Sequence, residues 1–320
     1  MRLKLSKTGF GFASAAGAYA IWGFLPIYWK LLDNIPAPEI LAHRILWSCG
    51  FLLGIFAVTG KMCSLYAETR AILAQPKKAW GLLAASLIMT VNWLIYIWAV
   101  NDGRIVETSL GYYINPLVNV LLGIAVLKER LTFWQTVSVV LAASGVLNLT
   151  LNFGAFPWVA IALAVSFALY GLCQKLLNIG GMTSITLETL ALLPATAAYL
   201  AWLQHNGAAA FTFAHPLTAL LLLGCGIVTA IPMVLFTNGA LYLPLTVLGF
   251  IQFLSPTIAL FVGIFLYHEP FSATHLISFG CIWVALLIFS LAQTNAWAAV
   301  SSLRRDRKNL LSCASKKAGL

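Results

Sequence analysis

The sequence is poor in charged residues. Only 9% of its 320 residues are Asp, Glu, Lys or Arg, whereas 61% are hydrophobic. A water-soluble domain carries roughly 25% charged residues, because its surface must face water. This scarcity excludes an ordinary soluble globular protein and indicates that lipid is the solvent for much of the surface.

Patterns typical of several other protein classes are also missing. No two of the six cysteines stand at metal-ligand spacing, so they predict neither a metal site nor a disulfide framework. No Walker-type glycine loop occurs, so ATP does not drive the protein directly. The net charge of +10 does not indicate nucleic-acid binding, because the basic residues flank apolar runs or lie in the tail. We expect no cofactor and no nucleic-acid partner.

What the sequence does contain is a series of ten apolar runs. Each is long enough to cross about 30 Å of hydrocarbon as a helix. Backbone amides in hydrocarbon need internal partners, so these runs are predicted to be helical. The predicted helices are 9–32, 39–59, 79–100, 105–127, 132–151, 155–174, 184–203, 217–237, 244–266 and 273–293. The expected fold class is an all-α integral membrane protein of ten transmembrane helices.

Basic residues are distributed unequally among the connections. With the N-terminus placed inside, sixteen Lys and Arg residues fall on the cytoplasmic side, and only Lys30 and Arg104 fall on the outer side. The positive-inside rule therefore predicts a multi-pass protein of a bacterial-type inner membrane with both termini cytoplasmic. Residues 296–320 form a basic tail on the same side.

A Pro-x6-Gly-x5-Glu pattern occurs twice, at a constant offset of 140 residues. Its copies are Pro116, Gly123 and Glu129, and Pro256, Gly263 and Glu269. The repeat predicts two five-helix halves, 1–150 and 151–295. Because five is odd, the second half enters the membrane inverted, which places the two glutamates at opposite faces. They are expected to cap or end helices. Inverted repeats of this kind are the architecture of many secondary transporters.

Arg44 is the costliest residue to insert within the predicted helices, at roughly 2.5–3.5 kcal/mol. It is either a fixed positive charge at the mouth of a polar cavity or a side chain that snorkels to the outer interface. Depth along the helices favours Glu107, or Asp102, over Glu188 as its partner, because the helix of Glu188 starts from the inner face. His43 points about 100° away around the helix and is not expected to share its site.

The segment 111–116 is predicted to line a path for a small molecule. Pro116 frees a backbone carbonyl near Tyr112, and Asn115 and Asn119 share a helix face. Segment 252–256 has the same character and is expected to face them. The alternative is a kinked packing helix whose amides bond to its neighbours. The path residues are predicted to be Arg44, Asn92, Trp93, Glu107, Tyr112, Asn115, Asn119, Tyr170, Glu188 and Gln252, with helix kinks at Pro116 and Pro256.

Several longer segments carry a resemblance to a known family. They are YAIWG (19–23), EILAHR (39–44), NW and WAVN within 92–101, ETSLGYYINPLVN (107–119), SFALYG (166–171), LGF (248–250) and IWVAL (282–286). They resemble the EamA repeat of the drug/metabolite transporter superfamily, most strongly its RarD branch, over about residues 9–293. The resemblance implies a ten-helix inner-membrane permease with two EamA-like repeats. The long tail after Arg304 departs from it.

The resemblance and the repeat together favour a secondary transporter, a permease or exporter of small metabolites or amphipathic drug-like compounds. The alternatives are an intramembrane enzyme and a non-transporting membrane receptor. An enzyme would need paired acid/base or metal-ligand residues at one depth, and His43 with Glu107 has no clear third partner. Proton coupling through Glu107, Glu188 or His43 and uncoupled exchange fit the sequence equally well.

Overall fold

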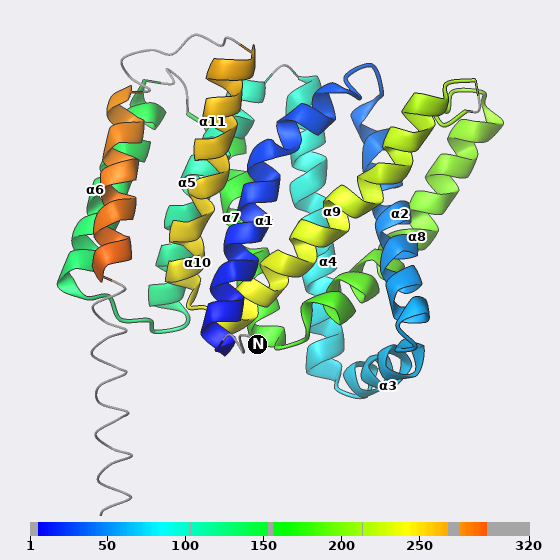
Figure 1. Cartoon of the computed structure of the whole chain (residues 1–320), viewed down its shortest axis with the longest axis horizontal. Helices are drawn as coiled ribbons and strands as arrows, with labels where there is room; N and C mark the ends of the chain where they lie inside the picture. The colour runs from blue at the N-terminus through cyan, green and yellow to red at the C-terminus, as the bar shows by residue number, and fades with distance from the viewer. Residues whose placement is uncertain (1–5, 103, 153–155, 213, 268–275, 293–320) are drawn as a thin grey trace, which may run out of the picture. The chain divides into compact units, whose positions relative to one another are not determined.

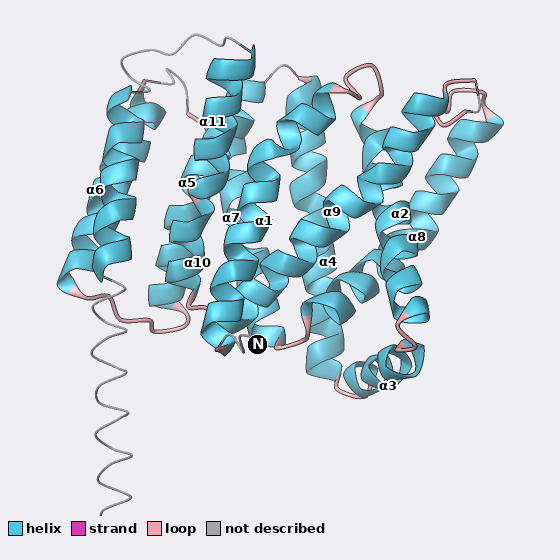
Figure 2. Cartoon of the chain, in the orientation of Figure 1, coloured by secondary structure: helices cyan, strands magenta, loops and turns pink. Residues whose placement is uncertain are grey.

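The computed structural model describes residues 6–102, 104–152, 156–212, 214–267 and 276–292. All regular secondary structure in these ranges is helical (Figures 1 and 2). The helices are α1 (Lys7–Lys30), α2 (Ala37–Val58), α3 (Met62–Leu73), α4 (Pro76–Asn101), α5 (Ile105–Ala125), α6 (Phe133–Leu151), α7 (Trp158–Leu177), α8 (Gly181–His205), α9 (Pro216–Tyr242), α10 (Leu245–Gln252), α11 (Leu254–Tyr267) and a further helix at Leu276–Ala292.

Eight spans in the described ranges are long and apolar enough to cross a membrane, with α10 and α11 together forming one of them. The helix α5 and the shorter apolar helix Leu276–Ala292 occupy the other two predicted runs. The prediction of an all-helical membrane protein is confirmed. Ten crossings and an inverted repeat remain predictions.

Two features differ from the apolar runs. The connection 60–78 contains α3, which buries Leu65 and Ile72 and exposes Tyr66, and which runs across the ends of α2 and α4 (Figure 1). The predicted helix 244–266 is divided at Phe253 into α10 and α11, whereas α5 continues as a helix through Pro116. The helix that carries the second proline motif is therefore interrupted, whereas the helix that carries the first is continuous.

The larger compact unit comprises residues 1–129 and 153–271. Within it, α1 packs against α9 and α11, α2 against α8 and α9, and α5 against α7 and α10. Helices of the first predicted half therefore pack against helices of the second. At the contact of α2 with α9, a Cβ on Gly226 would lie 2.3 Å from the backbone carbon of Trp47, so only glycine permits this approach.

The smaller unit contains α6 and the helix Leu276–Ala292. Thr132 and Gln135 form a capping box at the start of α6, which satisfies backbone donors there. A Cβ on Gly145 would lie 2.7 Å from the carbonyl oxygen of Ser278, so these two helices approach closely. The amide of Asn148 donates to the hydroxyl of Ser278 at 2.9 Å.

Candidate functional site

Arg44 lies on α2 and contacts side chains from three other helices. Its Nε donates a hydrogen bond to Oγ1 of Thr229 on α9 at 3.0 Å. The guanidinium carbon is 4.9 Å from the ring centre of Trp29 on α1 and 5.3 Å from that of Trp93 on α4. Such cation–π contacts are each worth about 0.5–2 kcal/mol, depending on desolvation. Arg44 is therefore held among helices by neutral groups.

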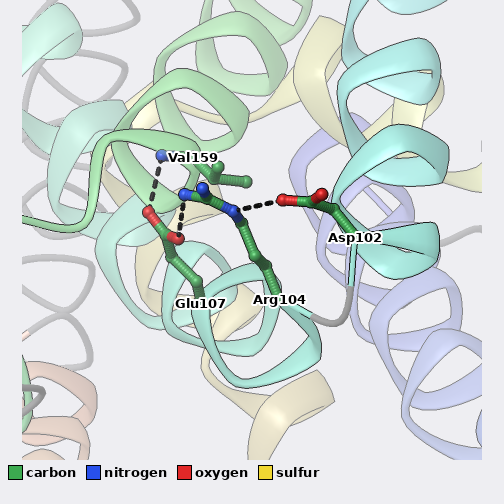
Figure 3. A network of polar contacts seen from close by, with 4 residues as sticks. All are labelled: Asp102, Arg104, Glu107 and Val159. Carbon is green, nitrogen blue, oxygen red and sulfur yellow. Dashed lines mark hydrogen bonds and ion pairs between the residues drawn. The ribbon is translucent and has the colours of Figure 1, made fainter.

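The prediction that Glu107 or Asp102 pairs with Arg44 is wrong. Asp102 accepts a hydrogen bond from Nε of Arg104 at 2.7 Å, and Glu107 lies 3.5 Å from Nη1 of the same guanidinium (Figure 3). Glu107 also accepts from the backbone N–H of Val159 at 2.8 Å. The hydrogen bond with Asp102, with the charges of both carboxylates, raises the pKa of Arg104. Arg104 holds these acids because it lies next to them in the chain.

Among the residues that the structure describes, no carboxylate oxygen lies within 4.0 Å of a nitrogen of Arg44. The phenols of Tyr96 and Tyr112 lie near enough to interact with it electrostatically, and the Tyr112 side chain is 51% exposed. Ionisable residues within membrane helices are costly and mark functional sites by default. Arg44 is such a residue, and the described part of the chain places no counter-ion next to it.

Glu188 is a buried acid on α8 that is held by neutral donors. Its carboxylate accepts hydrogen bonds from the hydroxyl of Tyr170 at 2.9 Å, the amide of Gln174 at 2.6 Å and the hydroxyl of Ser184 at 2.9 Å. No Lys, Arg or His of the described residues forms an ion pair with it. Glu188 is therefore the acidic counterpart of Arg44, again without a partner of opposite charge.

A small cavity lies next to Glu188 and next to two residues that contact Arg44. It measures about 20 Å³, enough for about one water molecule, so this cavity is too small for a metabolite-sized ligand. Its lining includes Glu188, Thr229 and Trp93, of which the last two contact Arg44. The other lining residues are Ser48, Ser86, Met89, Ile185, Thr189, Leu192 and Met233. Arg44 and Glu188 do not pair with each other, as predicted. Glu188 and two contacts of Arg44 nevertheless line one cavity, which the depth argument did not foresee.

The predicted path amides bond from helix to helix. Asn115 donates to the carbonyl oxygen of Ala164 at 2.5 Å, and Asn119 donates to Asn115 at 3.0 Å and to Gln252 at 2.9 Å. The hydroxyl of Tyr19 also reaches Gln252, at 3.4 Å. Gln252 thus faces Asn119 as predicted, but neither Asn115 nor Asn119 lines the cavity described above. Their place on a substrate path stays a prediction.

Asn92 makes a similar link between α4 and α7. Its amide donates to the carbonyl oxygen of Leu163 at 3.0 Å and to the hydroxyl of Ser166 at 2.8 Å. A buried amide with both partners satisfied stabilises the contact between these helices. Its neighbour Trp93, in contrast, faces the cavity.

The sequence matches one protein family twice. Residues 9–151 and 156–291 each match the EamA-like transporter family. The chain belongs to the EamA-like transporter family.

Relatives of this EamA-like protein agree. It is 43% identical to the uncharacterized transporter YojE of Bacillus subtilis, over 92% of this chain and 98% of that protein. It is 40% identical to the protein RarD of Salmonella typhimurium, over 88% of this chain and 95% of that protein. A solved crystal structure shares the fold, with a TM-score of 0.69, 17% identity, and coverage of 89% of this chain and 98% of the other. The EamA-like protein is thus an inner-membrane permease of the RarD branch, and not an enzyme.

Three large aromatic side chains, Trp93, Trp98 and Tyr170, occupy different places in this EamA-like transporter. Trp93 lines the cavity. Trp98 packs against Trp158, with ring centres 5.3 Å apart. Tyr170 stacks on Phe236 at 5.9 Å while its hydroxyl binds Glu188. Of these three side chains, Trp93 therefore lies next to Arg44 and Tyr170 lies next to Glu188.

Glu129 caps a helix, as predicted, but its partner was not foreseen. Its carboxylate accepts hydrogen bonds from the backbone N–H of Leu245 at 2.7 Å, and from the backbone N–H and hydroxyl of Thr246 at 2.9 and 2.5 Å. These groups begin α10, so the first half of the EamA-like chain caps a helix of the second. A Cβ on Gly123 would lie 2.7 Å from the same carboxylate. Glu269, the matching residue, lies outside the described residues.

The sequence reasoning missed several contacts of the site. Thr229 could have been noticed, because its hydroxyl stands within the very apolar helix α9. Trp29 gave no signal beyond its size. His43 belongs to a separate cluster, as its angle around the helix predicted. It accepts a hydrogen bond from Nε1 of Trp47 at 3.0 Å and lies 3.9 Å from Glu39.

Proposed function

We propose that this permease is a secondary transporter that moves small metabolites or amphipathic compounds by alternating access. The observation that carries the proposal concerns Arg44 and Glu188, neither of which has a partner of opposite charge among the described residues. Glu188 lines the same small cavity as Thr229 and Trp93, which contact Arg44. Charged groups at such a depth are tolerated when they meet a substrate, an ion or water. The small volume of the cavity is consistent with an occluded or closed state.

The proposed architecture is two inverted five-helix repeats, 1–150 and 151–295, followed by the basic tail 296–320. Two matches to one family support the repeat, and the packing of helices of one half against helices of the other supports movement between them. The site then opens to one face at a time. Both termini are proposed to be cytoplasmic, from the distribution of Lys and Arg.

The proposed path has two layers. Arg44, Trp93, Tyr112 and Glu188 meet the substrate directly. A second layer holds these side chains and the helices around them, and comprises Asn92, Glu107, Asn115, Asn119, Tyr170 and Gln252. Proton coupling, where it occurs, is proposed to use Glu188, because Glu107 bonds to Arg104 and a helix start instead.

The test of alternating access uses one cysteine in the cavity. Ser48 lines it, so a Ser48→Cys variant in a cysteine-free background should react with a membrane-impermeant maleimide from both faces. Reactivity from each face should change in opposite directions when a substrate or a pH gradient is applied. A cysteine at exposed position 54 on α2 is the matched control and should not respond. Labelling of position 48 from one face only, under all conditions, would contradict the proposal.

Transport itself is measured with the full chain in proteoliposomes, using a panel of labelled metabolites and drugs with and without a pH gradient. Arg44→Gln and Glu188→Gln should each abolish most of the uptake or efflux. Inverted topology is tested separately by external cysteine labelling, which should reach position 269 and not position 129. Equal labelling of both positions would refute the inverted repeat, but it would not contradict the proposal that the protein transports a substrate.

A further inference from the structure

Arg44 has unused hydrogen-bonding capacity. Only Nε has a partner, Thr229, and the two terminal nitrogens have none among the described residues. A guanidinium presents these nitrogens as a planar fork whose spacing matches the two oxygens of a carboxylate. The two terminal nitrogens of Arg44 can therefore bind a planar anion. The described residues of the protein provide no such anion.

The side chains around Arg44 indicate which chemical group is attached to that anion in the ligand. Two indole rings, from Trp29 and Trp93, lie within 4.9 and 5.3 Å of the guanidinium carbon. The phenol of Tyr96, on the same helix as Trp93, and that of Tyr112, on α5, also lie near the guanidinium. Flat aromatic walls favour a flat apolar body, through stacking and burial of apolar surface. A ligand with a carboxylate next to an aromatic ring would satisfy both the fork and the walls.

The charge of the site favours a ligand that carries a single negative charge. Three other basic side chains of the described region are engaged elsewhere. Lys30 lies 3.6 Å from the ring centre of Tyr267, Lys175 donates to the carbonyl oxygens of Ala240 and Leu243, and Arg104 binds two carboxylates. A single guanidinium in a region of low dielectric neutralises one charge, so a dianion such as a phosphate monoester would stay half uncompensated.

We propose that Arg44 binds the carboxylate of the transported substrate, and that the substrate is an aromatic monocarboxylate whose ring packs against Trp29 and Trp93. This inference rests on the proposed function, since it names the substrate class of the same site. The bound carboxylate supplies the counter-charge that Arg44 lacks. Binding would also widen the cavity, whose present volume of about 20 Å³ does not admit such a molecule.

The experiment measures binding to the purified full chain in lipid nanodiscs by calorimetry. The probes are benzoate, phenylacetate and indole-3-acetate, each paired with its neutral amide of nearly the same shape. At least one carboxylate should bind, and its amide should bind about 10- to 100-fold more weakly, the factor expected for losing a charge-assisted hydrogen bond. Arg44→Gln should weaken carboxylate binding by a similar factor and leave amide binding unchanged.

Two further variants separate the site from general effects. Trp93→Leu should weaken binding of the carboxylate and of its amide alike, because it removes an aromatic ring that packs against the ligand and leaves the Arg44 guanidinium in place. Arg104→Gln removes an arginine that already has two acidic partners and should leave binding unchanged. Where Arg44→Gln fails to fold, Arg44→Lys keeps the charge without the planar fork and should still weaken the carboxylate selectively.

Three results would overturn the inference: equal binding of acid and amide, unchanged carboxylate binding in a folded Arg44 variant, or no binding of any of the three carboxylates. None of them removes the proposed function, which depends on substrate-dependent labelling of position 48. Conversely, selective carboxylate binding together with one-sided labelling would make Arg44 an anion site on a protein that does not alternate.

Discussion

Replacing Glu129 tests whether the repeated proline–glycine–glutamate motif is a helix cap. In Glu129→Ala, the backbone N–H groups of Leu245 and Thr246 and one hydroxyl lose their acceptor at the start of α10. Glu129→Gln keeps a single acceptor oxygen and presents an NH₂ group to the remaining donors. We therefore expect both variants to be destabilised, with the alanine variant more affected.

The magnitude follows from the contacts. Losing a side-chain cap costs about 0.5–2 kcal/mol, and removing a negative charge from a helix N-terminus costs about 0.3–1 kcal/mol more. We expect about 2 kcal/mol for Glu129→Ala and roughly half of that for Glu129→Gln. By the scale of soluble domains of 150–250 residues, 2 kcal/mol lowers the melting temperature by about 4–8 °C.

Gly123→Ala provides an independent route to the same cap. Its Cβ would lie 2.7 Å from the Glu129 carboxylate and 2.8 Å from the hydroxyl of Thr246, so the acid must move away from its donors. Gly54→Ala is the matched control, because nothing lies within 4 Å of a Cβ there and alanine favours a helix by about 0.5–1 kcal/mol. Gly123→Ala should lower the melting temperature, whereas Gly54→Ala should leave it unchanged or raise it.

The assay is thermal unfolding of the purified protein in detergent, followed by circular dichroism. In the double variant Gly123→Ala with Glu129→Ala, the loss should be smaller than the sum of the single losses, because both act on one contact. A melting temperature for Glu129→Ala within about 1 °C of the wild type would refute the capping argument. Strict additivity of the two substitutions would refute the link between the glycine and the glutamate.

Three further outcomes are expected. Gly226→Ala should force α2 away from α9 at Trp47 and cost about 1–3 kcal/mol or more, seen as loss of monodisperse protein in gel filtration. Arg44→Ala and Glu107→Ala should affect the free energy of unfolding additively within about 0.5 kcal/mol, since they do not touch, and strong coupling would contradict the structure. A reporter that is active only in the periplasm should stay silent when fused after Leu320, and a signal would reverse the proposed orientation.

The helices could be predicted from sequence because hydrocarbon leaves the backbone no alternative. Their ends were less accessible: α1 starts at Lys7 because the Ser6 hydroxyl accepts from the backbone N–H of Gly9, a signal that an apolar run does not contain. The short helix α3 was missed for a related reason. Its buried Leu65 and Ile72 alternate with charged and exposed residues, so no long apolar run results.

The site was harder to predict than the fold. Depth along a helix gives one coordinate of a side chain, and the angle around the helix together with packing gives the others. Arg44 and Glu107 were predicted to lie at similar depths, but Arg104 is three residues from Glu107 in the chain and pairs with it instead. The expectation that segment 252–256 faces Asn119 agrees with the structure, because Asn119 and Gln252 lie close to the two prolines of the repeated motif. Glu188 was recognised as an ionisable residue. The spacing of residues in the sequence does not reveal the neutral side chains that donate hydrogen bonds to it.

The hydrogen bond between Arg44 and Thr229 also has a consequence for how the protein is made. The two residues are 185 positions apart. At a synthesis rate of about 5–20 residues per second, Thr229 leaves the ribosome roughly 9–37 s after Arg44. During that interval α2 carries an arginine that costs roughly 2.5–3.5 kcal/mol in the bilayer and lacks its hydroxyl partner. The early chain must therefore hold α2 at the insertion machinery, or with its arginine drawn to the interface, until α9 arrives.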